Sequence, residues 1–368
     1  MSGRQLIACK NDMKTITQFL THQVCANRTP SVQYAFFDVS DTLFEFRCGL
    51  KDIAAPQAVH AHTTYQLFSI TKTFTALAVM QLAEAGKLNV RKPVADYFPD
   101  FPYDRVITIE QLLSHTAGVP NPMPLRWTHL EKEHDQFQHD AFFKAVFARH
   151  PNLVFEPGTR FRYSNLGFVL LGQLIEKISG ESYEDYVTRN IFRKCGIENG
   201  ELRFTMDPST HATGYHPWFS VSNAALSWLI DKPRYMGPRE GRWKPFNRFY
   251  NNGKAYGGVI GSGKGLMRYA QTLMSDNTVL LGDKFKELLF AEKIIGTHRT
   301  GMACAWFTGE LKGNRYVAHA GGGGGYYAEL RVYPELKAGS YIVFNRSGMK
   351  DERMLDQTDR YFLTRNPV

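Results

Sequence analysis

The chain has 368 residues, of which 43% are hydrophobic and 21% are charged. This composition is ordinary for a globular protein and excludes a disordered, collagen-like or coiled-coil chain. At about 150 residues per domain, the length predicts about two domains. The formal net charge is +9, and the five cysteines are widely spaced without a CxxC pair. We therefore expect neither a zinc site nor a disulfide framework, and no metal or other cofactor.

The N-terminal residues contain no basic segment followed by an apolar core, so we expect no secretory signal. No run of 18 apolar residues occurs, so we expect no transmembrane helix and no membrane partner. These features predict a cytoplasmic protein with reduced thiols.

The first strands and helices can be read from hydrophobic patterns. Residues 34–48 predict two short strands around a Ser-Asp turn. Residues 69–85 are apolar nearly all round, which predicts a helix inside the domain core, and Gly86 fits the position after its end. Farther along, residues 166–179 and 184–192 have helical patterns among proline-containing loops.

The C-terminal part of the chain returns to strands. Strand patterns lie at residues 315–320, 326–333 and 340–345, with a hairpin turn at 334–339 before the last of them. Residues 351–365 then predict a helix.

Strands therefore cluster at both ends of the chain and helices in the middle. This order predicts an α+β fold, in which an antiparallel sheet flanked by helices is built from both termini and a mostly helical domain is inserted. We expect the sheet domain to comprise residues 1–90 plus 250–368 and the helical domain residues 91–249. The active site should lie at their interface.

The sequence Ser69-Ile70-Thr71-Lys72, at the start of the first helix, offers a nucleophile and a base. A serine hydroxyl needs a neighbouring base to attack at neutral pH. Positions three apart on a helix share a face, about 5–6 Å apart at Cβ. A lysine in a dry helix can lose its proton, and the Ser69 N–H at the helix start can stabilise an oxyanion. The simpler interpretation is a capping serine and a chance lysine. A second SxxK, at residues 347–350, has no buried helix after it.

Tyr163-Ser164-Asn165, just before the second helix, is the next candidate. Near a lysine cation, a tyrosine phenol can lose its proton below its usual pKa of about 10. It could then accept the proton of Ser69 or deliver one to a leaving group. Asn165 offers both a donor and an acceptor, which suit Lys72 and a substrate carbonyl. The simpler interpretation is a turn in which Ser164 or Asn165 caps the helix.

His319-Ala320-Gly321 ends a predicted strand and leads into the glycines at 322–325. Small residues there let a substrate lie along the strand edge, where backbone groups can bond to it. The alternative is a glycine-rich turn between two strands.

In this order, SITK, YSN and HAG resemble the three motifs of the serine β-lactamase and penicillin-binding-protein superfamily. YSN is similar to the branch that holds class C β-lactamases, DD-peptidases, D-aminopeptidases and family VIII carboxylesterases. The resemblance covers roughly residues 30–350 and includes stretches at 107–120, 155–180, 212–215 and 257–274. It implies a β-lactamase/transpeptidase-like fold.

The resemblance also implies roles for individual residues. Ser69 would be the acylated nucleophile, Lys72 and Tyr163 would share the base and acid work, and Asn165 and Gly321 would orient or bind the substrate. The oxyanion hole would be the backbone N–H groups of Ser69 and Gly322. His319 stands where many members carry a lysine that faces a substrate carboxylate. Because histidine is only partly charged at pH 7, this departure argues against an efficient β-lactamase.

These observations predict a serine hydrolase that acts through an acyl-enzyme, with a small-molecule carboxylic ester as the first choice of substrate. A weak β-lactamase, a D-amino-acid amidase, a DD-peptidase and an acyltransferase remain open. A non-catalytic binding protein with the same fold is an alternative of another class. The oligomeric state is also open.

Three other stretches have weaker signals. Residues 231–254 contain seven basic and two acidic residues interleaved with aromatics. They predict a solvated insertion or a lip of the active site that favours carboxylate or aromatic acyl groups, rather than a nucleic-acid partner. Residues 258–265 resemble a phosphate-binding loop but lack the Ser or Thr after the lysine. Residues 250–252 repeat the Tyr-x-Asn pattern, and we expect His115 to be structural, at a turn.

Overall fold

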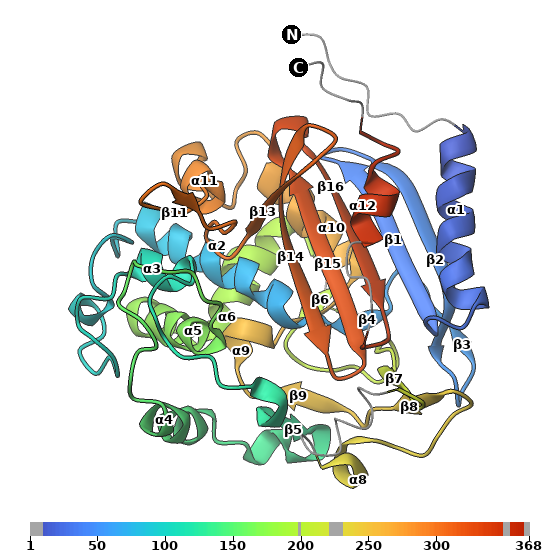
Figure 1. The fold of residues 1–368 in the computed structure, drawn as a ribbon, viewed down its shortest axis with the longest axis horizontal. Coiled ribbons are helices and arrows are strands. Elements are labelled where there is room, and N and C mark those ends of the chain that lie inside the picture. Colours follow the sequence, from blue (N-terminus) through green and yellow to red (C-terminus); the bar gives the residue numbers. More distant parts are fainter. Residues whose placement is uncertain (1–9, 198–199, 221–230, 349–353, 364–368) are drawn as a thin grey trace.

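The computed structural model describes residues 10–197, 200–220, 231–348 and 354–363. Its main sheet is antiparallel and has seven strands (Figure 1). In spatial order the strands are β13 (Phe307–Leu311), β14 (Asn314–Gly323), β15 (Tyr326–Tyr333), β16 (Ala338–Phe344), β1 (Ser31–Asp38), β2 (Thr42–Asp52) and β3 (Gln57–Ala58). The pairing of β1 with β16 joins the two ends of the chain in one sheet, as the sequence predicts.

The sheet is covered on both faces because its central strands are apolar on both sides. Along β1, Tyr34 and Phe36 pack in a cluster with α1 (Lys10–Cys25) and with Leu355 of α12 (Met354–Asp359). The alternate residue Phe37 packs in the main core, toward α10 (Gly263–Met274). Side chains alternate across a strand, so one short segment supplies both layers. The expected α+β fold is confirmed, with helices against an antiparallel sheet (Figure 1).

Two helices at the centre of the molecule match the sequence pattern closely. A 3-10 turn at Phe68–Ile70 leads into α2 (Thr71–Glu84), whose residues are buried almost throughout. Gly86 follows it with φ +70°, which glycine adopts without strain. The other helix, α5 (Asn165–Ser179), packs against α2. The helix predicted at 184–192 starts as α6 (Tyr183–Val187) and continues as a π-helical turn.

Shorter elements surround these helices. The helices are α3 (Ile109–Leu113), α4 (His139–Arg149), α8 (Lys232–Tyr235), α9 (Lys254–Gly257) and α11 (Asp283–Phe290). The strand groups are β4 (Thr64–Gln66) with β10 (Ile260–Ser262) and β6 (Leu202–Arg203), β5 (Thr128–Leu130) with β9 (Phe249–Asn251), β7 (Tyr215–Pro217) with β8 (Trp243–Pro245), and β11 (Ile294–Ile295) with β12 (His298–Arg299). Because β9 spans residue 250, it crosses the boundary expected between the two domains. The division into domains stays a prediction.

One local expectation changes, and the glycine-rich loop at 258–265 keeps its expected structural interpretation. The predicted C-terminal helix spans only Met354–Asp359 of the described residues, and residues 351–353 and 364–365 lie outside them. The loop at 258–265 has no room for a phosphate, because its glycines are packing sites. A Cβ on Gly263 would lie 2.2 Å from the Tyr341 ring, and the N–H of Gly265 already donates to Ser262 Oγ at 3.1 Å.

Candidate active site

Ser69 lies in the 3-10 turn before α2, and Lys72 lies in the first turn of that helix. Lys72 Nζ is 3.0 Å from Ser69 Oγ, 2.8 Å from Asn165 Oδ1 and 2.9 Å from the carbonyl oxygen of Tyr256. The side chain of Lys72 is fully buried, and this burial lowers its pKa well below the ordinary value of 10.5. The two residues that the sequence singles out therefore meet at hydrogen-bond distance.

The three partners of Lys72 fix how its amine points when it is neutral. A neutral amine has two N–H groups and one lone pair. The Asn165 amide oxygen and the Tyr256 carbonyl only accept hydrogen bonds, so they take both N–H groups. The lone pair is left facing Ser69, whose hydroxyl then donates to Lys72. This is the arrangement that a general base needs toward a nucleophile.

Tyr163 approaches the same hydroxyl from the loop before α5. Its phenol shares a hydrogen bond with Ser69, and the Lys72 Nζ lies 4.9 Å from the centre of its ring. Burial raises the pKa of Tyr163 above its ordinary value of 10, and the hydrogen bond with Ser69 offsets only part of that rise. The expectation that the phenol loses its proton below its usual pKa is therefore wrong. Because burial is the main cause of the rise, the phenol of Tyr163 stays protonated at neutral pH.

Asn165 is held in place by groups on both sides. Its Nδ2 donates to Asn121 Oδ1 at 3.1 Å, so its own Oδ1 is turned toward Lys72. Ser164 caps α5 by accepting the N–H of Gly167, as the simpler interpretation of this motif predicted. His115 accepts the N–H of Ser164 at 3.1 Å, which bears out its expected structural role. Capping and catalytic geometry thus coexist in one motif.

His319 lies on β14 with only 1% of its surface exposed. Its Nδ1 is 2.8 Å from the carbonyl oxygen of Ala320, to which it donates, and the ring packs near Tyr163 and Phe307. Burial and the neighbouring Lys72 lower the pKa of His319 to about 3. The imidazole is therefore neutral at pH 7, and the partial charge that the sequence led us to expect is absent.

The glycines after His319 serve different purposes. A Cβ on Gly321 would lie 2.0 Å from the carbonyl oxygen of Leu67 and 2.9 Å from the nitrogen of Ser69. Glycine at 321 therefore lets the turn that carries Ser69 pack directly on β14. This contact brings Gly322 beside Ser69, and both residues line one pocket. Gly321 is buried under the turn and is not among the lining residues.

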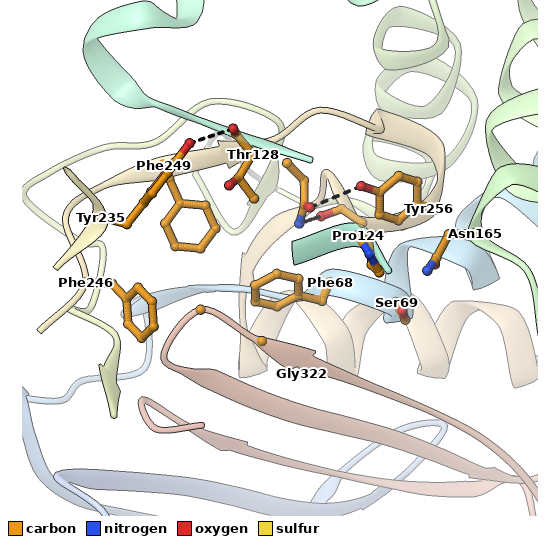
Figure 2. Close-up of a pocket in the computed structure, with 14 residues that line it drawn as sticks. Phe68, Ser69, Pro124, Thr128, Asn165, Tyr235, Phe246, Phe249, Tyr256 and Gly322 are labelled. Carbon is orange, nitrogen blue, oxygen red and sulfur yellow. Dashed lines mark hydrogen bonds between the residues drawn. The ribbon is translucent and has the colours of Figure 1, made fainter. Parts of the chain in front are cut away.

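The pocket beside Ser69 has a volume of about 190 Å³, is mostly apolar, and has five aromatic residues in its wall (Figure 2). The described residues that line it are Phe68, Ser69, Pro124, Thr128, Asn165, Tyr235, Phe246, Phe249, Asn251, Tyr256, Gly257, Gly322, Gly323 and Gly324. Sequence reasoning missed Phe68, Asn121 and Asn251. The position of Phe68 next to the nucleophile and the second Tyr-x-Asn at 250–252 are the signals that could have found two of them.

The basic stretch at 231–254 contributes aromatic side chains to this pocket but no basic ones. Arg234 and Arg248 form ion pairs with Glu133 and Glu131, respectively. Other basic side chains of the stretch lie over tryptophan rings; these are Arg239 and Lys244 over Trp218 and Arg242 over Trp243. The stretch therefore lines the pocket with aromatic side chains, while these cations contact other groups, and its role as an active-site lip stays a prediction.

The described residues contain no group of three or more His, Cys, Asp or Glu side chains placed to hold a metal ion. No helix in the described ranges is long and apolar enough to cross a membrane. The cysteines at 25, 48, 195 and 304 are free thiols.

Comparison with known proteins places this chain in a family. The model of the family described as Beta-lactamase matches residues 13–363, nearly the whole chain. The chain belongs to the Beta-lactamase family. Proteins of this family and fold are generally serine hydrolases.

The relatives of this family member are distant. Penicillin-binding protein 4* of Bacillus subtilis (strain 168) is 27% identical over 301 residues, which are 80% of this chain and 63% of the relative. Protein flp of Staphylococcus aureus (strain N315) is 26% identical over 211 residues, which are 56% of this chain and 41% of the relative. The chain thus spans less than two thirds of the length of these relatives.

Solved structures agree on the fold. The octameric penicillin-binding protein homologue from Pyrococcus abyssi aligns with a TM-score of 0.73 and 24% identity, over 92% of this chain and 74% of that one. A class C beta-lactamase in complex with cefoxitin aligns with a TM-score of 0.73 and 17% identity, over 96% and 98% of the two chains. At these identities the likeness establishes the fold alone.

Proposed function

We propose that this protein is a serine carboxylesterase that works through an acyl-enzyme on Ser69. The observation that carries the proposal is the contact of 3.0 Å between Ser69 Oγ and the buried amine of Lys72. Because burial lowers the pKa of Lys72, its amine gives up a proton more readily than an exposed lysine does and can act as a base.

Acylation follows from the positions of these groups. Ser69 Oγ attacks the ester carbonyl carbon while Lys72 Nζ takes the hydroxyl proton. The carbonyl oxygen becomes an oxyanion, which the N–H groups of Ser69 and Gly322 stabilise. The carbon–oxygen bond to the alcohol then breaks. Tyr163 donates its hydroxyl proton to the leaving alcohol oxygen. It receives the proton held by Lys72 in its place.

Deacylation uses the same groups in reverse. A water molecule attacks the acyl carbon and gives a proton to Lys72 through Tyr163. The bond to Ser69 Oγ breaks, the carboxylic acid leaves, and Ser69 regains its proton from Lys72. Asn165 holds the amine in place through both steps, because its amide oxygen is fixed by the contact with Asn121.

The charge of the site favours an ester over a substrate that carries a carboxylate. None of the described side chains that line the pocket is charged. His319 is neutral, since its pKa is lowered to about 3, so it does not offer a carboxylate an ion-pair partner. β-Lactams and peptides ending in D-alanine both carry such a carboxylate, whereas a simple ester does not.

Mass spectrometry of the intact protein tests the proposal directly. The protein is mixed in turn with 4-nitrophenyl butyrate, nitrocefin and a D-alanyl-D-alanine peptide. We expect a butyryl adduct on Ser69 that decays within minutes, and none in Ser69→Ala. A longer-lived adduct from the peptide alone would replace the esterase with a peptidase or amidase. No adduct from any of the three would favour the non-catalytic alternative.

A weak β-lactamase is the second candidate, favoured by the class C fold that aligns over 96% of the chain. A lysine at residue 319 would restore a cation beside the site. We expect His319→Lys to raise nitrocefin turnover relative to 4-nitrophenyl butyrate turnover at least tenfold. An unchanged ratio would mean that residue 319 does not decide between the two substrates.

Adding a short alcohol to the ester assay separates hydrolysis from acyl transfer. A hydrolase releases the carboxylic acid at the same yield with or without the alcohol. A transferase forms the new ester instead, which chromatography detects.

A further inference from the structure

The pocket beside Ser69 extends away from the proton-transfer groups. It runs from Ser69 and Gly322 toward Phe246, and Tyr235 and Thr128 lie along it (Figure 2). Neither Lys72 nor Tyr163 lines it. In an ester the alcohol oxygen must reach the group that returns its proton, so the alcohol lies on the side of Tyr163. The pocket is then available to the acyl group, which stays bound to Ser69 after the alcohol leaves.

Phe68, directly before the nucleophile, lines this pocket in an uncommon backbone conformation. Its φ is +43°, in the left-handed region that a bulky residue rarely adopts. Its ring is half-buried and packs near the rings of Phe249 and Tyr326, at 6.3 and 6.4 Å between centres. A strained residue at a functional site that presents its side chain to a pocket points to a role for that side chain.

The surroundings of the Phe68 ring hold it in place. A Cβ on Gly323 would lie 3.3 Å from the Phe68 ring, so the backbone at residue 323 closely contacts one side of that ring. Across the pocket, a Cβ on Gly324 would lie 2.2 Å from the ring of Phe249. Tyr235 is fixed by its hydroxyl, which donates to the carbonyl oxygen of Thr128 at 2.8 Å. The walls are therefore packed against backbone and cannot retreat far.

We propose that this pocket receives the acyl group of the substrate, that the group is neutral and apolar, and that the ring of Phe68 sets its upper size. The inference rests on the proposed esterase function and deepens it. In an apolar pocket one methylene changes the rate by about 10–200-fold, so a wall that cannot retreat limits the size of the acyl group. A charged acyl group would have to leave water without a partner, because no described lining side chain is charged.

Two series of esters separate the acyl side from the alcohol side. In the first, 4-nitrophenol is constant and the acyl group grows from acetyl through butyryl to 2-naphthoyl. In the second, acetyl is constant and the alcohol grows from 4-nitrophenol to 2-naphthol and 4-phenylphenol. We expect Phe68→Gly to raise kcat/KM for 2-naphthoyl over acetyl at least tenfold. The corresponding ratio in the alcohol series should move less than threefold.

Phe68→Gly is suited to this test because glycine adopts the left-handed backbone freely, so the turn should keep its shape. Phe246→Ala opens the far end of the pocket and should raise the same acyl ratio. Phe307→Ala is the matched control: it removes a ring that packs near Tyr163 but does not line the pocket. Its acyl ratio should stay within threefold of the wild-type value.

The experiment distinguishes failure of the acyl-pocket inference from failure of the proposed esterase function. If the wild-type protein forms no acyl adduct on Ser69, the esterase itself is wrong. If it hydrolyses esters but neither Phe68→Gly nor Phe246→Ala moves the acyl ratio, the acyl-pocket inference is overturned. A larger shift in the alcohol series than in the acyl series would also overturn it. Faster hydrolysis of a succinyl than of a butyryl ester would contradict the neutral acyl group.

Discussion

The chain contains the same four-residue pattern twice, and the two copies lie in unlike surroundings. Ser69 begins a buried helix, so the lysine one turn later shares its face and is cut off from water. Ser347 follows β16, where its hydroxyl accepts the N–H of Gly325 at 3.2 Å and lies 2.9 Å from His216 Nδ1. Lys350 lies outside the described residues. The comparison teaches that the same spacing in the sequence does not give the two serines the same surroundings.

The largest effect expected is loss of activity in Ser69→Ala. Removing a nucleophile leaves only binding and the oxyanion hole, so kcat for an ester should fall by about 10⁴–10⁶-fold. The melting temperature should change by no more than a few degrees, because Ser69 is only half-buried. Steady-state hydrolysis with a thermal melt checks both points. Activity above a hundredth of the wild-type value would place the nucleophile elsewhere.

The rate should depend on pH through Lys72 alone. In the proposed mechanism the neutral amine is the base, so kcat/KM should rise about tenfold per pH unit below the lowered pKa of Lys72 and then level off. His319 does not titrate in this range, since its pKa is lowered to about 3. Burial raises the pKa of Tyr163, so no falling limb is expected below about pH 10. A bell-shaped profile centred near pH 7 would contradict this assignment.

Lys72→Met should stabilise the fold while it removes the base. The folded chain binds the Lys72 proton less tightly than the unfolded chain, whose pKa is near 10.5. Stability of the wild type therefore rises with pH between the two pKa values. The advantage of the Met variant should be roughly 1–3 kcal/mol near neutral pH, and it should vanish above about pH 10.5. Urea melts at pH 7 and pH 10.5 measure the difference; an advantage that does not shrink would exclude burial as its cause.

The smallest effect is expected from Ser347→Ala. The variant loses the hydroxyl contacts with Gly325 and His216, which should cost about 1 kcal/mol of stability. Ester hydrolysis should stay within about twofold of wild type, since Ser347 is not a partner of Lys72. An inactive variant would mean that the second copy of the pattern carries the chemistry.

The sequence predicts the secondary-structure elements and which side chains come into contact, but not the protonation states of those side chains. The helix over 69–85, the strands at both ends and the approach of Ser69, Lys72 and Asn165 follow from local patterns and three ordered motifs. The protonation of Tyr163 and His319 does not, because it depends on how deeply strands and loops far apart in the sequence enclose them. Burial of this kind has no local signature.

The residues that line the pocket could not be predicted from the sequence, for a related reason. Its wall combines Phe68 with Phe246, Phe249 and the glycines at 323 and 324, which are separated by many residues in the sequence. The pattern of residues 231–254 pointed to an active-site lip, but it could not tell which side chains face the substrate. Ion pairs such as Arg234 with Glu133 decide that, and they join residues about a hundred positions apart.

The contact of the Ser69 turn with Gly321 has a consequence for protein synthesis. Ser69 is made early, whereas the strand that packs against its turn is made some 250 residues later. While the ribosome is still translating the middle of the chain, Ser69 lacks the glycines of β14 beside it and the sheet lacks its pairing of β1 with β16. In a nascent chain of this protein the pocket beside Ser69 is therefore incomplete until the C-terminal strands emerge, and folding waits on contacts that close a very long loop.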